Sequence, residues 1–203
     1  MKFYLEQEDQ KRDFNMKVIF LDIDGAMATS YTMKNGWKYK KNSSRLKYSN
    51  FIKDKKTLSR KCIRALNRLV VETKAKVVIT SAWRYDGDTK YFQRLFISRG
   101  FCGEIIDLSP KWEEYRNLIG IETINDLQMF WEYERGNEIR LWLEWNKHKN
   151  IESYIIIDDD VDDIEPLYEG RFIHTNIDQG FQGEKLLQEA INKLKGENND
   201  KID

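Results

Sequence analysis

The strongest constraint on the fold is an alternation along the chain between short apolar runs and longer amphipathic segments. The short runs are continuous and rich in β-branched residues, which is typical of strands buried on both faces of a parallel sheet. We predict strands at 18–21, 76–80, 104–106, 154–157 and 171–175. Apolar residues recur at helical spacing at 58–73, 91–98, 138–145 and 186–194. Strands that alternate with helices predict right-handed crossovers, and so a Rossmann-like α/β fold with a parallel sheet of about five strands flanked by helices.

The composition favours one soluble domain. A chain of 203 residues that is 40% apolar can bury one core, which we place at residues 16–195, after an N-terminal extension (1–15) and before a flexible tail (196–203). Lys plus Arg equals Asp plus Glu, 34 against 34, so net charge gives no argument for nucleic acid or membrane binding. Cys62 and Cys102 are too few for a disulfide framework or a zinc site. With no membrane-spanning run and no signal peptide, we expect a cytoplasmic protein with no membrane partner and no obligate protein partner.

Polar residues stand directly after three of the predicted strands. They are Asp22 and Asp24, then Thr80 and Ser81, then Asp158, Asp159 and Asp160. Each group alone is an ordinary turn, charged loop or helix cap. Together they are expected at one edge of the sheet, because the carboxyl ends of parallel strands meet there and bind ligands there. Crowded carboxylates need a cation, and an all-oxygen set suits Mg²⁺.

Three of these segments resemble motifs of the haloacid dehalogenase (HAD) superfamily of phosphatases. Residues 18–25 (VIFLDIDG) resemble motif one, residues 77–81 (VVITS) motif two and residues 155–159 (IIIDD) motif four. The resemblance therefore implies an HAD-like fold and Mg²⁺-dependent phosphate chemistry.

Further segments make the resemblance more specific. They are Thr80 to Arg84, Arg135 to Ile139, Trp142 with Leu143, His174 with Thr175, and Gly180 with Phe181. The whole pattern, over roughly residues 17–194, resembles the HAD domain of Swiss Army knife RNA repair proteins. A more distant likeness is the phosphatase domain of bacteriophage polynucleotide kinase-phosphatase.

The resemblance implies a role for each catalytic residue. Asp22 would attack phosphorus and form an aspartyl phosphate, while Asp24, held by the Gly25 turn, would act as acid and base. Thr80 or Ser81 would bind the phosphoryl group, and the motifs do not decide between the two hydroxyls.

The cation and the metal ligands follow in the same way. Arg135 is expected to take the place of the lysine common in this superfamily, since Lys147 and Lys149 fall at the far end of the same helix. Arg84 would bind substrate phosphate or form a surface salt bridge. The Mg²⁺ ligands would be the Asp22 carboxylate, the Asp24 backbone carbonyl and Asp159, with Asp158 beside them but not bound to the ion. Asp163 would complete the set.

Two insertions bear on the substrate. Residues 31–61 are rich in lysine and arginine with interleaved aromatic residues, which suits a single-stranded nucleic-acid end; Lys38 and Lys40 are our candidate contacts. The alternative is a solvated loop whose aromatic residues pack on the domain. Residues 111–134 are also aromatic and are expected mainly to pack. Both are small for caps and would leave an open site.

These observations predict a Mg²⁺-dependent phosphatase, and more specifically a polynucleotide 3′-phosphatase of nucleic-acid repair that acts on an RNA or DNA end. The alternative on the same catalytic frame is a nucleotide or small-metabolite phosphatase. An alternative of another class is a catalytically silent module that binds nucleic acid or phosphate.

Overall fold

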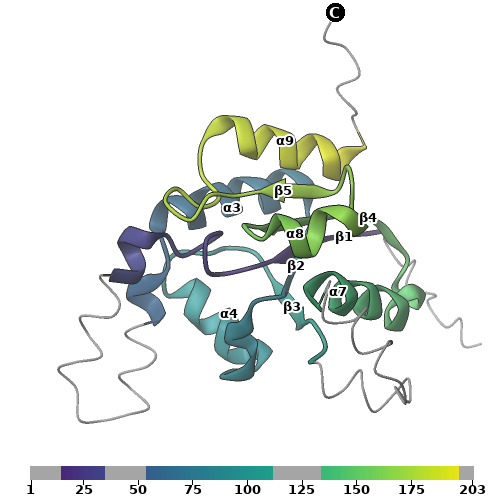
Figure 1. Ribbon diagram of the computed structural model, residues 1–203, viewed down its shortest axis with the longest axis horizontal. Coiled ribbons are helices and arrows are strands. Elements are labelled where there is room, and N and C mark those ends of the chain that lie inside the picture. The colour runs from purple at the N-terminus through teal and green to yellow at the C-terminus, as the bar shows by residue number, and fades with distance from the viewer. Residues whose placement is uncertain (1–14, 35–53, 112–133, 197–203) are drawn as a thin grey trace, which may run out of the picture.

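Five parallel strands form one sheet at the centre of the protein. The structure, a computed structural model, describes residues 15–34, 54–111 and 134–196 (Figure 1). The strands are β1 (Met16–Leu21), β2 (Lys76–Ile79), β3 (Ile105–Leu108), β4 (Ile151–Asp158) and β5 (Phe172–His174). Their order is β3-β2-β1-β4-β5, so β1 lies in the middle with β2 and β4 on either side. The predicted α/β fold is confirmed.

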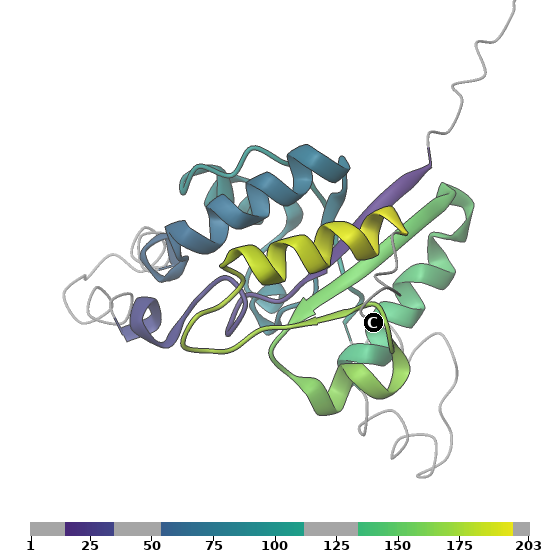
Figure 2. The same ribbon diagram turned by 90° about the horizontal axis from the view of Figure 1, so that it is seen from above.

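Helices cover both faces of the sheet. The longer helices are α3 (Arg60–Thr73), α4 (Thr89–Ile97), α7 (Glu134–Trp145) and α9 (Glu184–Lys195). The described residues also contain short helical turns: η1 (Ala82–Tyr85), η2 (Lys147–Lys149), α8 (Val161–Ile164) and η3 (Glu165–Leu167). Helices α3 and α9 lie side by side over one face, with α7 on the other (Figures 1 and 2). None of the described helices is long and apolar enough to cross a membrane.

The two faces of β1 pack into two separate cores. Ile19 and Leu21 belong to the larger core, which α3, α4 and α9 cover, whereas Val18 and Phe20 belong to a smaller core with Trp142 of α7. Successive strand residues point to opposite faces, so the residue two positions after Phe20 points to the α7 face. That residue is Asp22.

Several element bounds differ from the prediction. Strand β4 begins three residues earlier than expected, and β3 runs to Leu108. Helix α7 begins at Glu134 instead of at 138, because its first turn, with Arg135 and Gly136, has no apolar periodicity to reveal it. Helices α8 and η3 were not predicted.

Large parts of the two predicted insertions lie outside the described residues. The structure describes residues 31–34 and 54–61 of the first insertion and residues 111 and 134 of the second. Lys38 and Lys40 are therefore not placed. Most of the proposed extension and tail also lies outside the described residues.

Candidate active site

The ends of β1, β2 and β4 bring the predicted site residues together. Asp22 N donates to Ile157 O at 3.0 Å, and Thr80 N donates to Leu21 O at 2.9 Å. These bonds continue the register in which Leu21 lies between Ile79 and Ile157. Thr80, Asp22 and Asp158 thus form one row across three strands, on the face that α7 covers.

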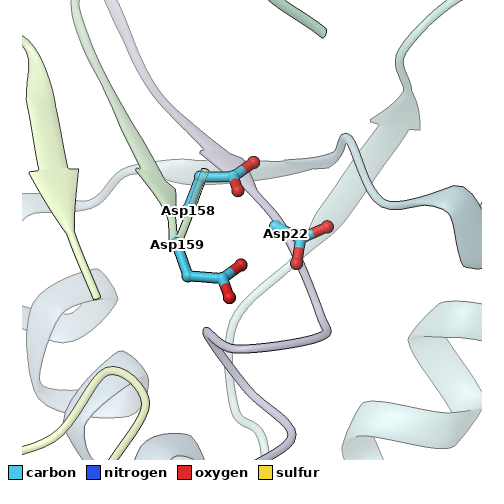
Figure 3. Close-up of side chains that lie close together, drawn as sticks. All are labelled: Asp22, Asp158 and Asp159. Atoms are coloured by element: carbon cyan, nitrogen blue, oxygen red, sulfur yellow. The ribbon is translucent and has the colours of Figure 1, made fainter. Parts of the chain in front are cut away.

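Three carboxylates converge at this row. One carboxylate oxygen from each of Asp22, Asp158 and Asp159 lies within 4.8 Å of the other two, and the side chains gather at the ends of β1 and β4 (Figure 3). Asp22 and Asp158 are buried, and Asp159 is half-buried. Asp158, which is expected beside the ion-binding carboxylates, lies within this group, and which of the three carboxylates bind an ion stays a prediction. Asp163 does not belong to the group.

The electrostatics of the group fit a divalent cation. Burial and the nearby charge of Asp22 raise the pKa of Asp158 to about 7. Burial also raises the pKa of Asp22, against the opposing charge of Arg135. Buried carboxylates held this close favour protonation unless positive charge is supplied, and their hard oxygen atoms are the ligands that Mg²⁺ prefers.

Gly25 allows Asp159 to reach this group. Its φ of 76° lies in the left-handed region that glycine adopts most easily. A Cβ at this position would lie 2.1 Å from the carboxyl carbon of Asp159. The glycine after Asp24 is therefore required both by the turn and by the close approach of the β4 carboxylate.

Arg135 connects two of the carboxylates. Its Nη1 donates to Asp22 Oδ1 at 2.7 Å and to Asp158 Oδ2 at 3.1 Å, and its side chain keeps 21% of its surface exposed. Burial alone would lower the pKa of Arg135, but the charges of Asp158 and Asp22 raise it, so the guanidinium stays charged. The arginine predicted to carry positive charge at this site does reach it.

Asp163 holds the start of α7 instead of joining the carboxylate group. Its Oδ2 accepts a hydrogen bond of 2.9 Å from the backbone N of Arg135. At the next residue, Gly136, a Cβ would come within 2.8 Å of the Asp163 carbonyl oxygen and 2.7 Å of Leu167. The close contact between α7 and α8 therefore fixes the backbone from which Arg135 extends.

The two candidate hydroxyls of motif two have different surroundings. Thr80 is fully buried in the row beside Asp22, and its Oγ1 has no hydrogen-bond partner among the residues that the structure describes. Ser81 Oγ accepts a hydrogen bond from Trp83 N at the start of η1. Thr80 thus has a donor to offer to a ligand, whereas Ser81 caps a helical turn.

Arg84 forms a buried ion pair with Glu138 of α7. Its Nη2 donates to Glu138 Oε1, and the two side chains are only 3% and 2% exposed. Its Nη1 donates to the carbonyl oxygens of Thr80 and Ser81 at 3.2 and 2.9 Å. Of the two expected roles, the structure favours the salt bridge, but this salt bridge is buried and not on the surface. The sequence analysis did not identify Glu138. Its position one helical turn after Arg135 puts the two side chains on the same side of α7, and this spacing could have indicated that Glu138 faces the site.

Asp24 lies at the edge of the site and is exposed. Its Oδ2 accepts a hydrogen bond of 2.9 Å from Nε1 of Trp83, the residue before Arg84 in η1. Its side chain is not part of the group of three carboxylates. Sequence reasoning also missed Trp83, because no local spacing pattern connects residues 59 positions apart.

Comparison with known protein families gives a match that extends over most of the chain. The family model described as the HAD domain in Swiss Army Knife RNA repair proteins matches residues 18–186. This range contains every strand but the first two residues of β1, and all the site residues described above. Comparison with curated proteins and with solved structures gave no match.

Proposed function

Since the chain belongs to the family of HAD domains in Swiss Army Knife RNA repair proteins, we propose that it is a Mg²⁺-dependent phosphomonoesterase that acts through an aspartyl phosphate on Asp22. One observation carries this proposal: Arg135 contacts Asp22 and Asp158, and the Asp159 carboxylate lies beside these two carboxylates. This arrangement supports the proposal because Asp22 would act as the nucleophile, Arg135 would supply a fixed positive charge, and the carboxylates would supply oxygen ligands for a cation.

The first displacement transfers the phosphoryl group to the protein. An Asp22 oxygen forms a bond to phosphorus as the bond from phosphorus to the leaving oxygen breaks, and Asp24 gives the leaving oxygen its proton. In the second displacement a water oxygen forms a bond to the same phosphorus as the bond from phosphorus to the Asp22 oxygen breaks, and Asp24 takes the proton from that water. This step restores the Asp22 carboxylate and releases phosphate.

Arg135 and Thr80 would hold the transferring group. Arginine in this role contributes about 10³ to 10⁵ in rate in other phosphoryl-transfer enzymes. The Thr80 hydroxyl, which has no hydrogen-bond partner within residues 15–34, 54–111 and 134–196, can donate to a phosphoryl oxygen. Asp22, Asp158 and Asp159, with the backbone carbonyl of Asp24, would hold Mg²⁺, which when bound neutralises charge on the phosphoryl oxygens and the carboxylates.

The substrate we propose is the 3′-phosphate of an RNA or DNA end. The family description refers to RNA repair proteins. The segment between β1 and α3 also combines lysines such as Lys38 and Lys40 with aromatic residues, the two ingredients of single-strand binding.

Phosphate release from a simple aryl phosphate in Mg²⁺ tests the chemistry. We expect Asp22→Asn to abolish release, because an amide cannot act as the nucleophile. Asp162→Asn is the matched control, since this exposed carboxylate of α8 lies outside the site. Full activity of Asp22→Asn would rule out the mechanism.

A second comparison tests the substrate. A 3′-phosphorylated oligonucleotide should be hydrolysed with a higher kcat/KM than a mononucleotide, and this advantage should fall steeply as salt rises. Equal values for the two substrates at every salt concentration would favour a nucleotide or small-metabolite phosphatase.

A further inference from the structure

The turn after β1 fixes the backbone of Asp24 but leaves its side chain exposed. Met27 N and Ala28 N both donate to Ile23 O, at 2.8 and 2.7 Å, and Gly25 N donates to Ala28 O at 2.9 Å. An exposed aspartate on a fixed backbone still samples several side-chain rotamers. A proton donor that must meet one leaving oxygen needs a further contact to select one of them.

Trp83 supplies this contact from a position that does not depend on Asp24. It lies in η1, directly after β2, and its ring packs against the larger core. The next residue, Arg84, is held by Glu138 and by the carbonyl oxygens of Thr80 and Ser81. The indole N–H therefore points at Asp24 Oδ2 from an anchored turn, at 2.9 Å.

The chemistry of indole makes the contact directional. Tryptophan Nε1 is a donor only, and it neither accepts nor gives up a proton in the range where enzymes work. The hydrogen bond engages Oδ2 of Asp24, so Oδ1 is the oxygen left to meet the leaving group. The hydrogen bond thus selects both the rotamer and the oxygen that serves the leaving group.

We propose that Trp83 is a positioning residue that orients Asp24 for transfer of a proton to the leaving oxygen. This inference rests on the proposed function. It predicts a defect that depends on the leaving group: an activated aryl phosphate needs little protonation as it leaves, whereas an alkyl phosphate, like a polynucleotide 3′-phosphate, needs a proton.

The experiment measures release of the leaving alcohol in a single turnover, which isolates the first displacement. General acid catalysis contributes about 10² to 10⁴ in rate, so we expect Trp83→Phe to slow an alkyl phosphate about 10-fold to 100-fold and an activated aryl phosphate by less than about threefold. In an Asp24→Asn background, Trp83→Phe should cause no further loss, because the acid it orients is gone.

Trp142→Phe is the matched control. Trp142 Nε1 also donates to an aspartate, Asp107 Oδ2, at 2.8 Å, but in the smaller core and away from Asp24. Any loss from this change should be equal for the two substrates. If Trp83→Phe does not fold, benzothienylalanine at position 83 keeps the shape of the side chain and replaces the N–H with sulfur.

Different outcomes would count against the positioning role and against the proposed function. Equal slowing of both substrates by Trp83→Phe, or no slowing of either, overturns the positioning role. Absence of phosphate release by the unaltered protein in Mg²⁺ contradicts the proposed function itself, whatever the variants do.

Discussion

Two arginines lie between the sheet and α7, and their charge balance differs. Arg84 meets one carboxylate, Glu138, and both side chains are almost fully buried. Arg135 meets Asp22 and Asp158, with Asp159 close by, and keeps 21% of its side chain exposed. Arg84 meets a single carboxyl group away from solvent, whereas Arg135 meets more carboxyl groups than one guanidinium can balance. The first pair therefore supports the structure, and the second is where we propose that a cation and a substrate phosphate bind.

Removing Arg135 should cause the largest loss of activity. We expect Arg135→Gln to lower kcat by about 10³ to 10⁵, because the variant lacks the charge that balances the phosphoryl group. Stability should change less than activity, since Mg²⁺ can still neutralise the carboxylates. Steady-state kinetics and urea unfolding in Mg²⁺ measure the two effects.

Arg68→Gln is the control for this change. Arg68 forms an exposed pair with Glu184, which is worth little in solution. If the kcat of Arg135→Gln were similar to that of Arg68→Gln, the catalytic role of Arg135 would be contradicted.

Removing Arg84 should mainly affect stability. Burial raises the pKa of Glu138 to about 8 even though Arg84 acts against this shift. We expect Arg84→Met to lower the free energy of unfolding by about 3 to 5 kcal/mol, because a buried carboxylate loses its partner. Urea denaturation measures the loss.

A double variant separates pairing from packing. Arg84→Met with Glu138→Leu removes both charges and should recover much of the lost stability, since an apolar pair of similar volume often replaces a buried ion pair. If the double variant is less stable than Arg84→Met, the comparison between the two arginines fails.

The crowded carboxylates around Arg135 also predict that the stability of the protein depends on pH. The pKa of Asp158 rises from its ordinary value of 3.8 to about 7, so between these values the folded protein binds more protons than the unfolded chain. Without a metal, the free energy of unfolding should therefore fall as pH rises through this window. Mg²⁺ needs the ionised carboxylates, so its stabilising effect should grow over the same window.

Thermal unfolding with and without Mg²⁺ measures this effect. At a fixed Mg²⁺ concentration of about 100 times the Kd at pH 8, Mg²⁺ should add about 2.7 kcal/mol to the free energy of unfolding at pH 8. The same concentration should add much less at pH 5, where binding is weaker. Asp158→Asn should flatten the pH dependence. An equal gain at both pH values would show that these carboxylates do not hold the ion.

The sequence predicted the strand-end row but not the contacts that cross it. Apolar runs ending in polar residues identify β1, β2 and β4, and parallel strand ends must meet, so Asp22, Thr80 and Asp158 could be placed together. The bonds from Trp83 to Asp24 and from Arg84 to Glu138 join residues 59 and 54 positions apart. Such pairs depend on how η1 and α7 pack, which no periodicity encodes.

The start of α7 is a second feature that depends on tertiary packing and that the sequence did not predict. Glycine lowers helix propensity, so Gly136 disfavours a helix at that point. Glycine fits at position 136 because the α8 backbone comes too close for a Cβ. The local preference and the tertiary requirement point in opposite directions, and packing decides.

Asp163 provides the smallest test, because it separates a metal ligand from a helix cap. It accepts from the backbone N of Arg135 and lies outside the group of three carboxylates. As a cap its removal in Asp163→Ala should cost about 0.5 to 2 kcal/mol of stability and leave the Mg²⁺ affinity unchanged. Asp159→Ala should do the reverse, lowering Mg²⁺ affinity with little loss of metal-free stability, because Asp159 adds negative charge to the crowded group. Calorimetric titration with Mg²⁺ and urea unfolding distinguish the two variants. Weakened Mg²⁺ binding in Asp163→Ala would show that Asp163 is a metal ligand, and the carboxylate group around Arg135 would then have one more member than the structure indicates.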